Sequence, residues 1–411
     1  MNKIIKNIAL FDGRTKQDIL ISDQNIADIN KNLAKSDAGK GLSDADIIDG
    51  SGLTALPAII DIGTFKIDKA AFFMGGIARA ALMPDQNPTL DEPSAVKYAA
   101  LKAKPDLWIH PIGAATKGLE NQSMAEYALM KDAGARAIST GRHWISNSGL
   151  MLKIQQYAAS LDLPLIIHAE DCGLTHGANA TSSLNATILG ILAAPPQAES
   201  IAIARDIALA EISGAALHFR HVTTAKSLDL IKQAKKQGLK ITAGVSPAYL
   251  LLNDMAISDF RTFAHLSPPL RSEDDRLAAL EALADGTIDI LCSAHDPRDV
   301  EEKRLPFSDS AAGMVGAQSL LSHGLNLVRD GVINMERLTQ LLSSNPAKLL
   351  GLGNAGKLEN GFEADIILVD EDAPWQIKSD NLPGLAGNTP FDGLPVIGKV
   401  RHMLKGGKLL F

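Results

Sequence analysis

Short apolar runs alternate with longer amphipathic stretches through the middle of this 411-residue chain. Each apolar run has the length of a strand that is buried on both faces, and each amphipathic stretch has the apolar spacing of a helix. The alternation predicts repeated strand-helix units in which the strands are parallel. Eight strands are predicted, at residues 56–62, 78–83, 107–112, 135–139, 163–168, 216–221, 240–245 and 288–293.

Eight such units match a closed TIM barrel, so the predicted fold class is α/β with a (β/α)8 barrel over residues 55–350. The two chain ends differ from this middle, because their strand-like runs are separated by glycines rather than by helices. These runs lie at residues 4–11, 18–21 and 361–369. We expect residues 1–54 plus 351–411 to pair as one small β domain beside the barrel.

Composition and charge exclude several classes of protein. The formal net charge of -7 and the sequence pI of about 5.8 argue against a nucleic-acid surface, which needs a basic excess. No run of about 18 apolar residues is present to span a bilayer, and the beginning of the chain lacks the pattern of a signal peptide. We therefore expect a cytoplasmic protein that binds neither nucleic acid nor membrane. Cys172 and Cys292 stand far apart, which favours reduced thiols over a disulfide.

Short motifs stand where the predicted strands end, and a parallel barrel gathers its functional side chains at those ends. In chain order they are Met83-Pro84-Asp85, His110-Pro111-Ile112-Gly113, His168-Ala169-Glu170-Asp171, His221-Val222-Thr223-Thr224, Pro268-Pro269-Leu270-Arg271, Ser344-Asn345-Pro346-Ala347 and Asn388-Thr389-Pro390-Phe391. Together they resemble the motifs of the dihydroorotase branch of the amidohydrolase superfamily. The resemblance covers essentially all of the chain and implies an amidohydrolase-type barrel.

The resemblance also implies a defined chemistry. Dihydroorotases hold one or two zinc ions and use a metal-bound hydroxide to open, or in reverse to close, a cyclic amide in pyrimidine synthesis. Zinc lowers the pKa of its bound water toward neutrality and polarises the carbonyl, so several ligands must converge around an open coordination position. The resemblance therefore predicts where metal ligands should stand in this sequence.

Most of those ligands are missing. The family's His-x-His at the first strand is replaced by Gly63-Thr64-Phe65, and the arginine that binds the substrate carboxylate falls on Ile67. The bridging carboxylate falls on Thr140 or Gly141, neither of which can span two metals. The last-strand aspartate, which serves as ligand and general base, falls on Ala294.

Two histidines survive at ligand positions, His168 and His221, at the ends of the fifth and sixth predicted strands. One interpretation is a residual single-zinc site in which Asp61 or Asp171 supplies a carboxylate. The other is that both histidines are hydrogen-bonded remnants in the barrel mouth. Two imidazoles supply only part of the roughly 10 to 16 kcal/mol of a four-ligand structural zinc, so we expect no cofactor, or at most one weakly bound zinc.

The pattern of loss has a physical logic. Without the metals, a retained bridging carboxylate and a retained aspartate would place two like charges in one partly desolvated pocket, at a cost of several kcal/mol. Thr140 or Gly141, together with Ala294, avoids that repulsion, and Phe65 could fill the space of metal and substrate. The changes indicate a site that has been repacked rather than altered at one position.

This pattern is most similar to the non-catalytic dihydroorotase-like subunit that partners aspartate carbamoyltransferase, the preceding pyrimidine enzyme, in some bacteria. The resemblance implies a pseudoenzyme that is retained as an assembly subunit of a mixed oligomer, a dodecamer of two kinds of chain. The alternative is an active, divergent dihydroorotase or other cyclic-amide hydrolase with one zinc on His168 and His221. It needs a third ligand and a base, for which Asp61, Asp171 and Asp296 are the candidates.

Two further groups of polar residues are predicted to be structural. Four residues follow one amphipathic stretch and are expected to form ion pairs on a helix face. They are Glu199, Arg205, Asp206 and Glu211. His110 is expected to satisfy a backbone group.

Overall fold

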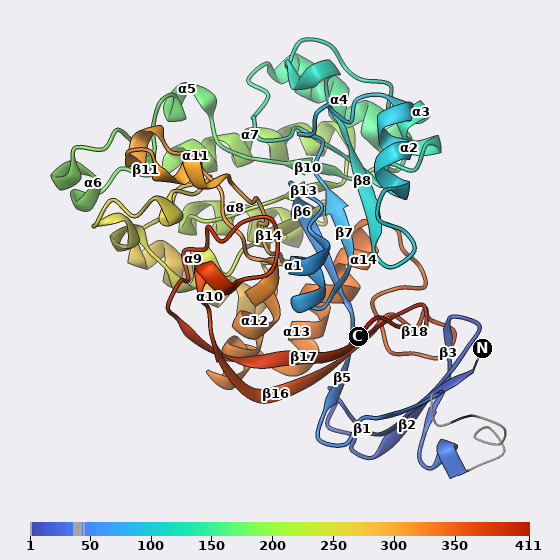
Figure 1. Cartoon of the computed structure of the whole chain (residues 1–411). Coiled ribbons are helices and arrows are strands. Elements are labelled where there is room, and N and C mark those ends of the chain that lie inside the picture. Colours follow the sequence, from blue (N-terminus) through green and yellow to red (C-terminus); the bar gives the residue numbers. More distant parts are fainter. Residues whose placement is uncertain (1, 36–42, 44–45) are drawn as a thin grey trace.

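A nearly closed barrel of eight parallel strands forms the centre of the computed structural model, which describes residues 2–35, 43 and 46–411 (Figure 1). The strands follow one another around the barrel in chain order. They are β6 (Ile59–Thr64), β7 (Ile77–Leu82), β8 (Trp108–Ala114), β9 (Ala137–Ser139), β10 (Leu165–Ile167), β13 (Leu217–Phe219), β14 (Ile241–Val245) and β15 (Ile290–Leu291). Phe65 N donates to His295 O at 2.9 Å, and Ser293 N donates to Asp61 at 2.9 Å, so the first strand is joined to the segment after the last.

Each of the eight predicted strands overlaps a strand of this barrel, which confirms the predicted fold class. The first prediction needs a correction, because residues 56–62 belong to two different strands. β5 (Thr54–Pro57) pairs with β16 in a second sheet, whereas β6 starts at Ile59. Between them, Ala58 N donates to Asp365 O at 2.9 Å, so the chain crosses from one sheet to the other at this residue.

Helices cover the outside of the barrel (Figure 1). The longer ones are α2 (Pro93–Leu101), α4 (Ser148–Ser160), α7 (Gln197–Ser213), α8 (Ala225–Lys236), α10 (Glu273–Asp285) and α12 (Leu320–Arg329). The shorter ones are α1 (Lys69–Met74), α3 (Tyr127–Asp132), α5 (Cys172–Thr175), α6 (Leu184–Leu189), α9 (Ala248–Leu251), α11 (Val300–Arg304), α13 (Met335–Thr339) and α14 (Asn345–Leu349). α8 shows the local cause: Thr224 caps its first turn, while Leu228 and Ile231 bury one face against the barrel.

Strands from both chain ends form a second sheet, as predicted, in the order β18-β17-β16-β5-β1-β2-β3 with β4 beside β1. Besides β5, they are β1 (Lys3–Leu10), β2 (Gln17–Ser22), β3 (Asn25–Asn30), β4 (Ile47–Asp49), β16 (Ile366–Gln376), β17 (Pro395–Lys405) and β18 (Lys408–Leu409). The run predicted at residues 361–369 is shifted, because Gly361 has a φ of 87° in the turn that precedes β16. The limits of this β domain at residues 54 and 350 stay predictions.

A buried ionic cluster joins the barrel to the second sheet. Arg79 of β7 donates to Asp365 at 2.8 Å and pairs with Glu363, and Lys405 of β17 lies 2.9 Å from Asp365. His110 faces this cluster, with Nε2 3.5 Å from Arg79 Nη1, so the expectation of a backbone partner for His110 is wrong. Burial, followed by the charge of Arg79, lowers the pKa of His110 to about 3.

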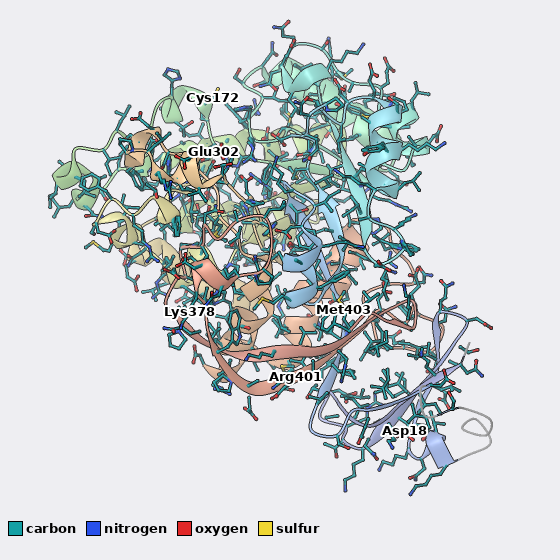
Figure 2. The ribbon with its side chains drawn as sticks, in the orientation of Figure 1. Asp18, Cys172, Glu302, Lys378, Arg401 and Met403 are labelled. Atoms are coloured by element: carbon teal, nitrogen blue, oxygen red, sulfur yellow. The ribbon has the colours of Figure 1, made fainter. Side chains whose placement is uncertain are left out.

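Both cysteines are free thiols, as predicted. Cys172 is exposed on α5 (Figure 2), and Cys292 is buried directly after β15. Within the residues that the structure describes, no helix is both long enough and apolar enough to cross a membrane.

Candidate functional site

The ends of β6 and β13 bring the central residues of the barrel mouth together. Gly63 and Phe65 stand at the end of β6, and Arg220 and His221 directly follow β13. Gly63 has a φ of 84°, and a Cβ at this position would lie 3.1 Å from Arg220 Cδ. Glycine therefore leaves the room that the Arg220 side chain occupies.

Two guanidinium groups lie on the ring of Phe65. Arg142 Cζ is 3.6 Å and Arg220 Cζ 4.8 Å from the ring centroid, and both distances are within the range of cation–π contacts. Arg142 also donates to Asp296 at 2.6 Å, and Arg298 donates to the same carboxylate oxygen at 2.9 Å. These side chains fill most of the barrel mouth.

A cavity of about 30 Å³ remains in the mouth. One buried water needs about 10 to 15 Å³ of such volume, so the cavity has room for about two. Its lining includes Phe65, Arg142, Arg220, His221, Tyr249, Ser267, Ala294 and Asp296. This packing agrees with the hypothesis that Phe65 fills the space of metal and substrate.

His168 uses both of its ring nitrogens within the protein. Arg220 Nη2 lies 3.3 Å from Nδ1, and because a guanidinium can only donate, Nδ1 accepts this bond. The ring proton then resides on Nε2, which lies 3.4 Å from Glu170. Burial lowers the pKa of His168 although Glu170 opposes the shift, so the ring is neutral at neutral pH and has no free lone pair.

His221, the second predicted ligand, also flanks Arg220 and is buried. Its Nδ1 lies 3.8 Å from the thiol of Cys292, and its ring is tilted toward Tyr249 with centroids 5.6 Å apart. Burial, followed by the charge of Arg220, lowers the pKa of His221 well below its ordinary value. The structure thus brings His168 and His221 to the same mouth and places a cation beside both of them.

Each of the three candidate carboxylates accepts hydrogen bonds from other groups of the protein. Asp61 accepts from the backbone and hydroxyl of Ser293, which ties it to barrel closure. Asp171 caps α5 by accepting from Gly173 N at 2.8 Å, and Asp296 belongs to the arginine pair described above. Among the described residues, no three His, Cys, Asp or Glu side chains are grouped so that they could hold a metal ion.

The residues that stand at the positions of the missing ligands contact other parts of the barrel mouth. Thr140 Oγ1 accepts from His168 N at 3.4 Å, so it supports the strand end where a bridging carboxylate would stand. Gly141 has a φ of 68°, and a Cβ there would lie 2.9 Å from Asp85. Asp85 accepts from Arg142 N at 3.0 Å, which places a carboxylate beside the guanidinium stack.

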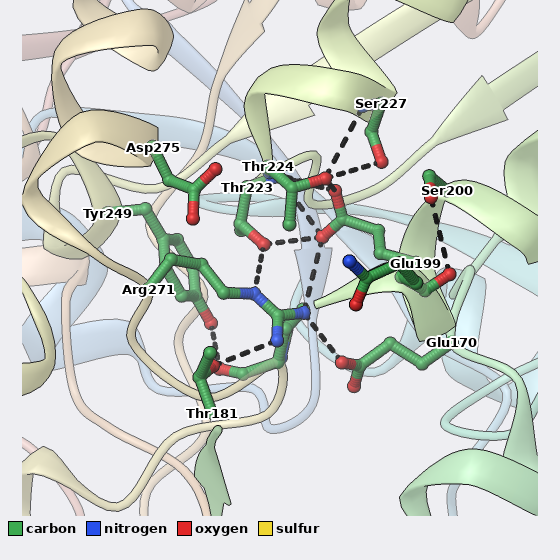
Figure 3. Close-up of polar contacts among 12 residues, drawn as sticks. Glu170, Thr181, Glu199, Ser200, Thr223, Thr224, Ser227, Tyr249, Arg271 and Asp275 are labelled. Atoms are coloured by element: carbon green, nitrogen blue, oxygen red, sulfur yellow. Dashed lines mark hydrogen bonds and ion pairs between the residues drawn. The ribbon is translucent and has the colours of Figure 1, made fainter. Parts of the chain in front are cut away.

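A buried network beside the mouth orders the surrounding loops (Figure 3). Arg271 donates to Glu170 at 2.7 Å, to Thr223 at 2.9 Å and to Thr181 at 3.0 Å, and it lies 3.4 Å from Glu199. Burial alone would raise the pKa of Glu170, but Arg271 and His168 lower it to about 2. Glu170 is therefore a fixed anion that orients the ring of His168.

Of the ion pairs predicted on α7, the one between Arg205 and Asp206 is confirmed, with Nη2 2.7 Å from Oδ1, whereas Glu199 pairs with Arg271 outside the helix. Glu199 is fully buried and accepts from the backbone of Thr223 at 3.0 Å and of Thr224 at 2.9 Å. Asp206 is also buried, where it accepts from Trp144 Nε1 at 3.0 Å and from Arg205 at 2.8 Å. These carboxylates face the barrel because α7 packs its acidic positions against the loops of neighbouring units.

Sequence reasoning missed the two arginines that decide the character of the mouth. Arg220 directly precedes His221 at the end of an apolar strand, and a charged residue at a buried strand end is uncommon enough to be a signal. Arg142 stands in a loop, and its approach to Phe65 depends on tertiary packing alone.

A model described as the amidohydrolase family matches residues 71–410 of this chain. The dihydroorotase of Acetivibrio thermocellus is 34% identical, over 99% of this chain and 98% of that protein. The dihydroorotase of Ruminiclostridium cellulolyticum is 35% identical with the same coverage.

Solved structures of hydantoinases share the fold. The L-hydantoinase (dihydropyrimidinase) from Arthrobacter aurescens matches with a TM-score of 0.87 at 24% identity, covering 100% of this chain and 96% of that chain. The dihydropyrimidinase from Brevibacillus agri matches with a TM-score of 0.82 at 22% identity, covering 100% and 95%. At these identities the likeness concerns the fold alone.

Proposed function

Since this chain belongs to the amidohydrolase family, we propose that it is a catalytically inactive dihydroorotase homologue that serves as an assembly subunit with aspartate carbamoyltransferase in pyrimidine biosynthesis. The observation that carries the proposal is the position of Arg220. Its guanidinium lies between His168 and the Phe65 ring, where it uses the Nδ1 lone pair of His168.

Electrostatics oppose a zinc ion in this mouth. At a separation of about 4 Å and an effective dielectric constant of about 20, a dication and a guanidinium repel by roughly 8 kcal/mol. A full set of four structural ligands contributes roughly 10 to 16 kcal/mol, and His168 and His221 would supply only part of it. The repulsion is therefore about as large as the roughly 5 to 8 kcal/mol that two of four ligands could provide.

The position of the family's general base is also changed. The position of the last-strand aspartate is Ala294, and the nearby Asp296 is bonded to Arg142 and Arg298. Both arginines contact Oδ2 of Asp296, and they fix the orientation of this carboxylate. A hydrolytic step would thus need a base at a position other than that of the family's aspartate.

An exposed apolar face formed by α6 and the residues directly after it supports a docking role. Leu184, Ile188 and Leu192 are 77%, 73% and 62% exposed. Residues 177–198 contain no charged side chain, although 21% of the whole chain is charged. Asn185 Nδ2 donates to Asp254 O at 2.7 Å, which anchors α6 to the barrel loops. We propose that this face contacts the carbamoyltransferase, because exposed apolar patches mark protein interfaces.

Size-exclusion chromatography of this chain with its cognate aspartate carbamoyltransferase tests the proposal. The expected result is a stable co-eluting complex and less than one zinc per chain. The double variant Leu184→Glu and Ile188→Glu should elute separately from the carbamoyltransferase. Leu385→Glu, at a residue 63% exposed on another surface, is the matched control and should still co-elute. Separate elution of the wild-type chains would contradict the assembly role.

A second candidate function is an active dihydroorotase or other cyclic-amide hydrolase with a single zinc on His168 and His221. It is favoured by the 34–35% identity to dihydroorotases along nearly the whole chain. Zinc analysis and a dihydroorotate hydrolysis assay on the isolated chain separate the two functions. Stoichiometric zinc with turnover, both abolished by His221→Ala, would establish the hydrolase and overturn the pseudoenzyme.

A further inference from the structure

Arg220 differs from the other deeply buried arginines in having no carboxylate partner. Arg79 and Arg271 are each 2% exposed, and each lies within ion-pair distance of two carboxylates. Arg220 is 3% exposed, its Nε has no hydrogen-bond partner, and no described carboxylate lies within 4 Å of its guanidinium. A buried, unpaired charge of this kind is costly, so its environment favours a counter-ion.

The charges that face the cavity leave a positive excess. Arg142 and Arg298 share the carboxylate of Asp296, and Asp85 accepts from the backbone of Arg142. Of the charged residues that line the cavity, Arg142 and Arg220 are cations and Asp296 is an anion, with Oδ1 of Asp296 accepting no hydrogen bond from a described residue. The nearby Glu170 pairs with Arg271, so it does not compensate the charge of Arg220.

The cavity has the lining and the size for a very small anion. Arg220, His221 and Ser267 all line it and carry N–H or O–H groups. Its volume of about 30 Å³ admits a particle of about the size of one or two waters. A cyclic amide with a carboxylate is far larger than this space, whereas a single halide ion is of the right order.

We propose that the barrel mouth is a halide-binding site in which a chloride ion lies against the guanidinium of Arg220. The ion neutralises the buried charge and receives hydrogen bonds from the lining residues. The sign of the site is thereby inverted relative to a metal centre, because the protein supplies the cation and takes up the anion. The inference is independent of the assembly role, since it requires neither a partner chain nor catalysis.

Thermal unfolding at constant ionic strength tests the site in solution. Sodium gluconate is replaced stepwise by sodium chloride, so that the chloride concentration rises while the ionic strength stays constant. The gluconate anion is too large for the cavity. A ligand that binds only the folded state should raise the melting temperature by about 2 °C for each tenfold increase above its dissociation constant. Arg220→Met should abolish this response, whereas Arg401→Met, at an exposed arginine on β17, should retain it. Equal responses of wild type and Arg220→Met would overturn the proposal.

Crystals of the wild-type protein grown in sodium bromide supply a second measurement, which decides the question even if Arg220→Met fails to fold. The expected result is an anomalous bromide peak within hydrogen-bond distance of Arg220. Peaks confined to the surface would mean an adventitious ion only and would overturn the site. Zinc content and co-elution with the carbamoyltransferase are measured separately, so failure of the halide site and failure of the proposed function are distinguishable.

Discussion

Two buried arginines in neighbouring parts of the barrel rim have opposite surroundings. Arg271 is surrounded by hydrogen-bond acceptors, among them Glu170 and Glu199 (Figure 3). Arg220 instead lies on the ring of Phe65 and donates to the imidazole of His168. The first arrangement orders the loops around the mouth, and the second occupies the place where chemistry would be done. The contrast indicates that the frame of the site persists while its centre has been replaced.

The Arg271 network also bears on the shape of the exposed rim. The Arg271 network joins the segments that follow β10 and β13, and the segment after β10 also carries α5 and α6. A shape that is held by this network does not depend on a metal in the mouth. The rim is therefore ordered by contacts among its own side chains.

The largest effect is expected when the network loses its cation. Arg271→Met leaves Glu170 and Glu199 buried without their charge partner, which should lower the free energy of unfolding by about 3 to 5 kcal/mol. Urea denaturation followed by circular dichroism measures the change. Arg220→Met is the matched control in the mouth, and it should cost less than about 1 kcal/mol or stabilise the protein. Equal losses of unfolding free energy in the two variants would contradict the proposed difference between Arg271 and Arg220.

Removal of the positive charge of Arg220 should raise the affinity of the barrel mouth for zinc. Arg220→Met frees Nδ1 of His168 and removes the repulsion, so zinc should bind at least tenfold more tightly than to the wild type. Isothermal titration with zinc chloride measures the difference. Adding His221→Ala to Arg220→Met should reverse the gain, because one of two imidazoles is lost. An unchanged zinc affinity in Arg220→Met would show that Arg220 does not exclude the metal.

Acid should destabilise the two regions at different pH. Burial lowers the pKa of His168 and His221 below the ordinary value of 6.5, so protons bind the unfolded chain more tightly and stability is lost as pH falls below about 6.5. Glu170, with a pKa of about 2 against an ordinary 4.5, contributes stability that is lost only as pH falls from about 4.5 toward 2.

Variants separate these contributions. His221→Gln should reduce the slope of unfolding free energy against pH between about 6.5 and 4.5 by up to about 1.4 kcal/mol per pH unit. Glu170→Gln should leave that interval unchanged and alter the slope only below about pH 4.5. Denaturant midpoints at a series of pH values provide the measurement. Identical slopes for His221→Gln and wild type would contradict a buried neutral His221.

The smallest effect concerns the two thiols. Cys172 is exposed on the rim, and Cys292 is packed in the mouth against His221 and Val245 O. A thiol reagent should modify one cysteine per native chain and the second only after unfolding. Cys172→Ser should remove the fast reaction and change stability by less than about 0.5 kcal/mol. Two fast-reacting thiols would mean that the mouth is open.

The sequence predicted the barrel well because its strands are apolar runs of recognisable length. The limit between β5 and β6 was missed, since residues 56–62 are uniformly apolar and nothing local marks the change of sheet at Ala58. The absence of metal-binding side chains at Gly63, Thr140 and Ala294 was also predicted, from the spacing of the motifs and from the family resemblance.

The replacement of the centre could not be predicted in the same way. The stack of Arg142 and Arg220 on Phe65 joins residues from three separate loops, and its geometry follows from tertiary packing. Glu199 was misplaced for a related reason. Its amphipathic helix has charged residues on the face that packs against other loops, where Thr223 and Arg271 satisfy them.

The backbone at Gly63 couples the end of β6 to the side chain of Arg220. Its φ of 84° suits glycine, and a side chain there would begin 3.1 Å from Arg220 Cδ. A side chain at this position would require Arg220 to shift by a few tenths of an ångström, so the two residues limit each other's size. Any larger residue at the end of β6 is therefore coupled to the placement of the guanidinium that lies on Phe65.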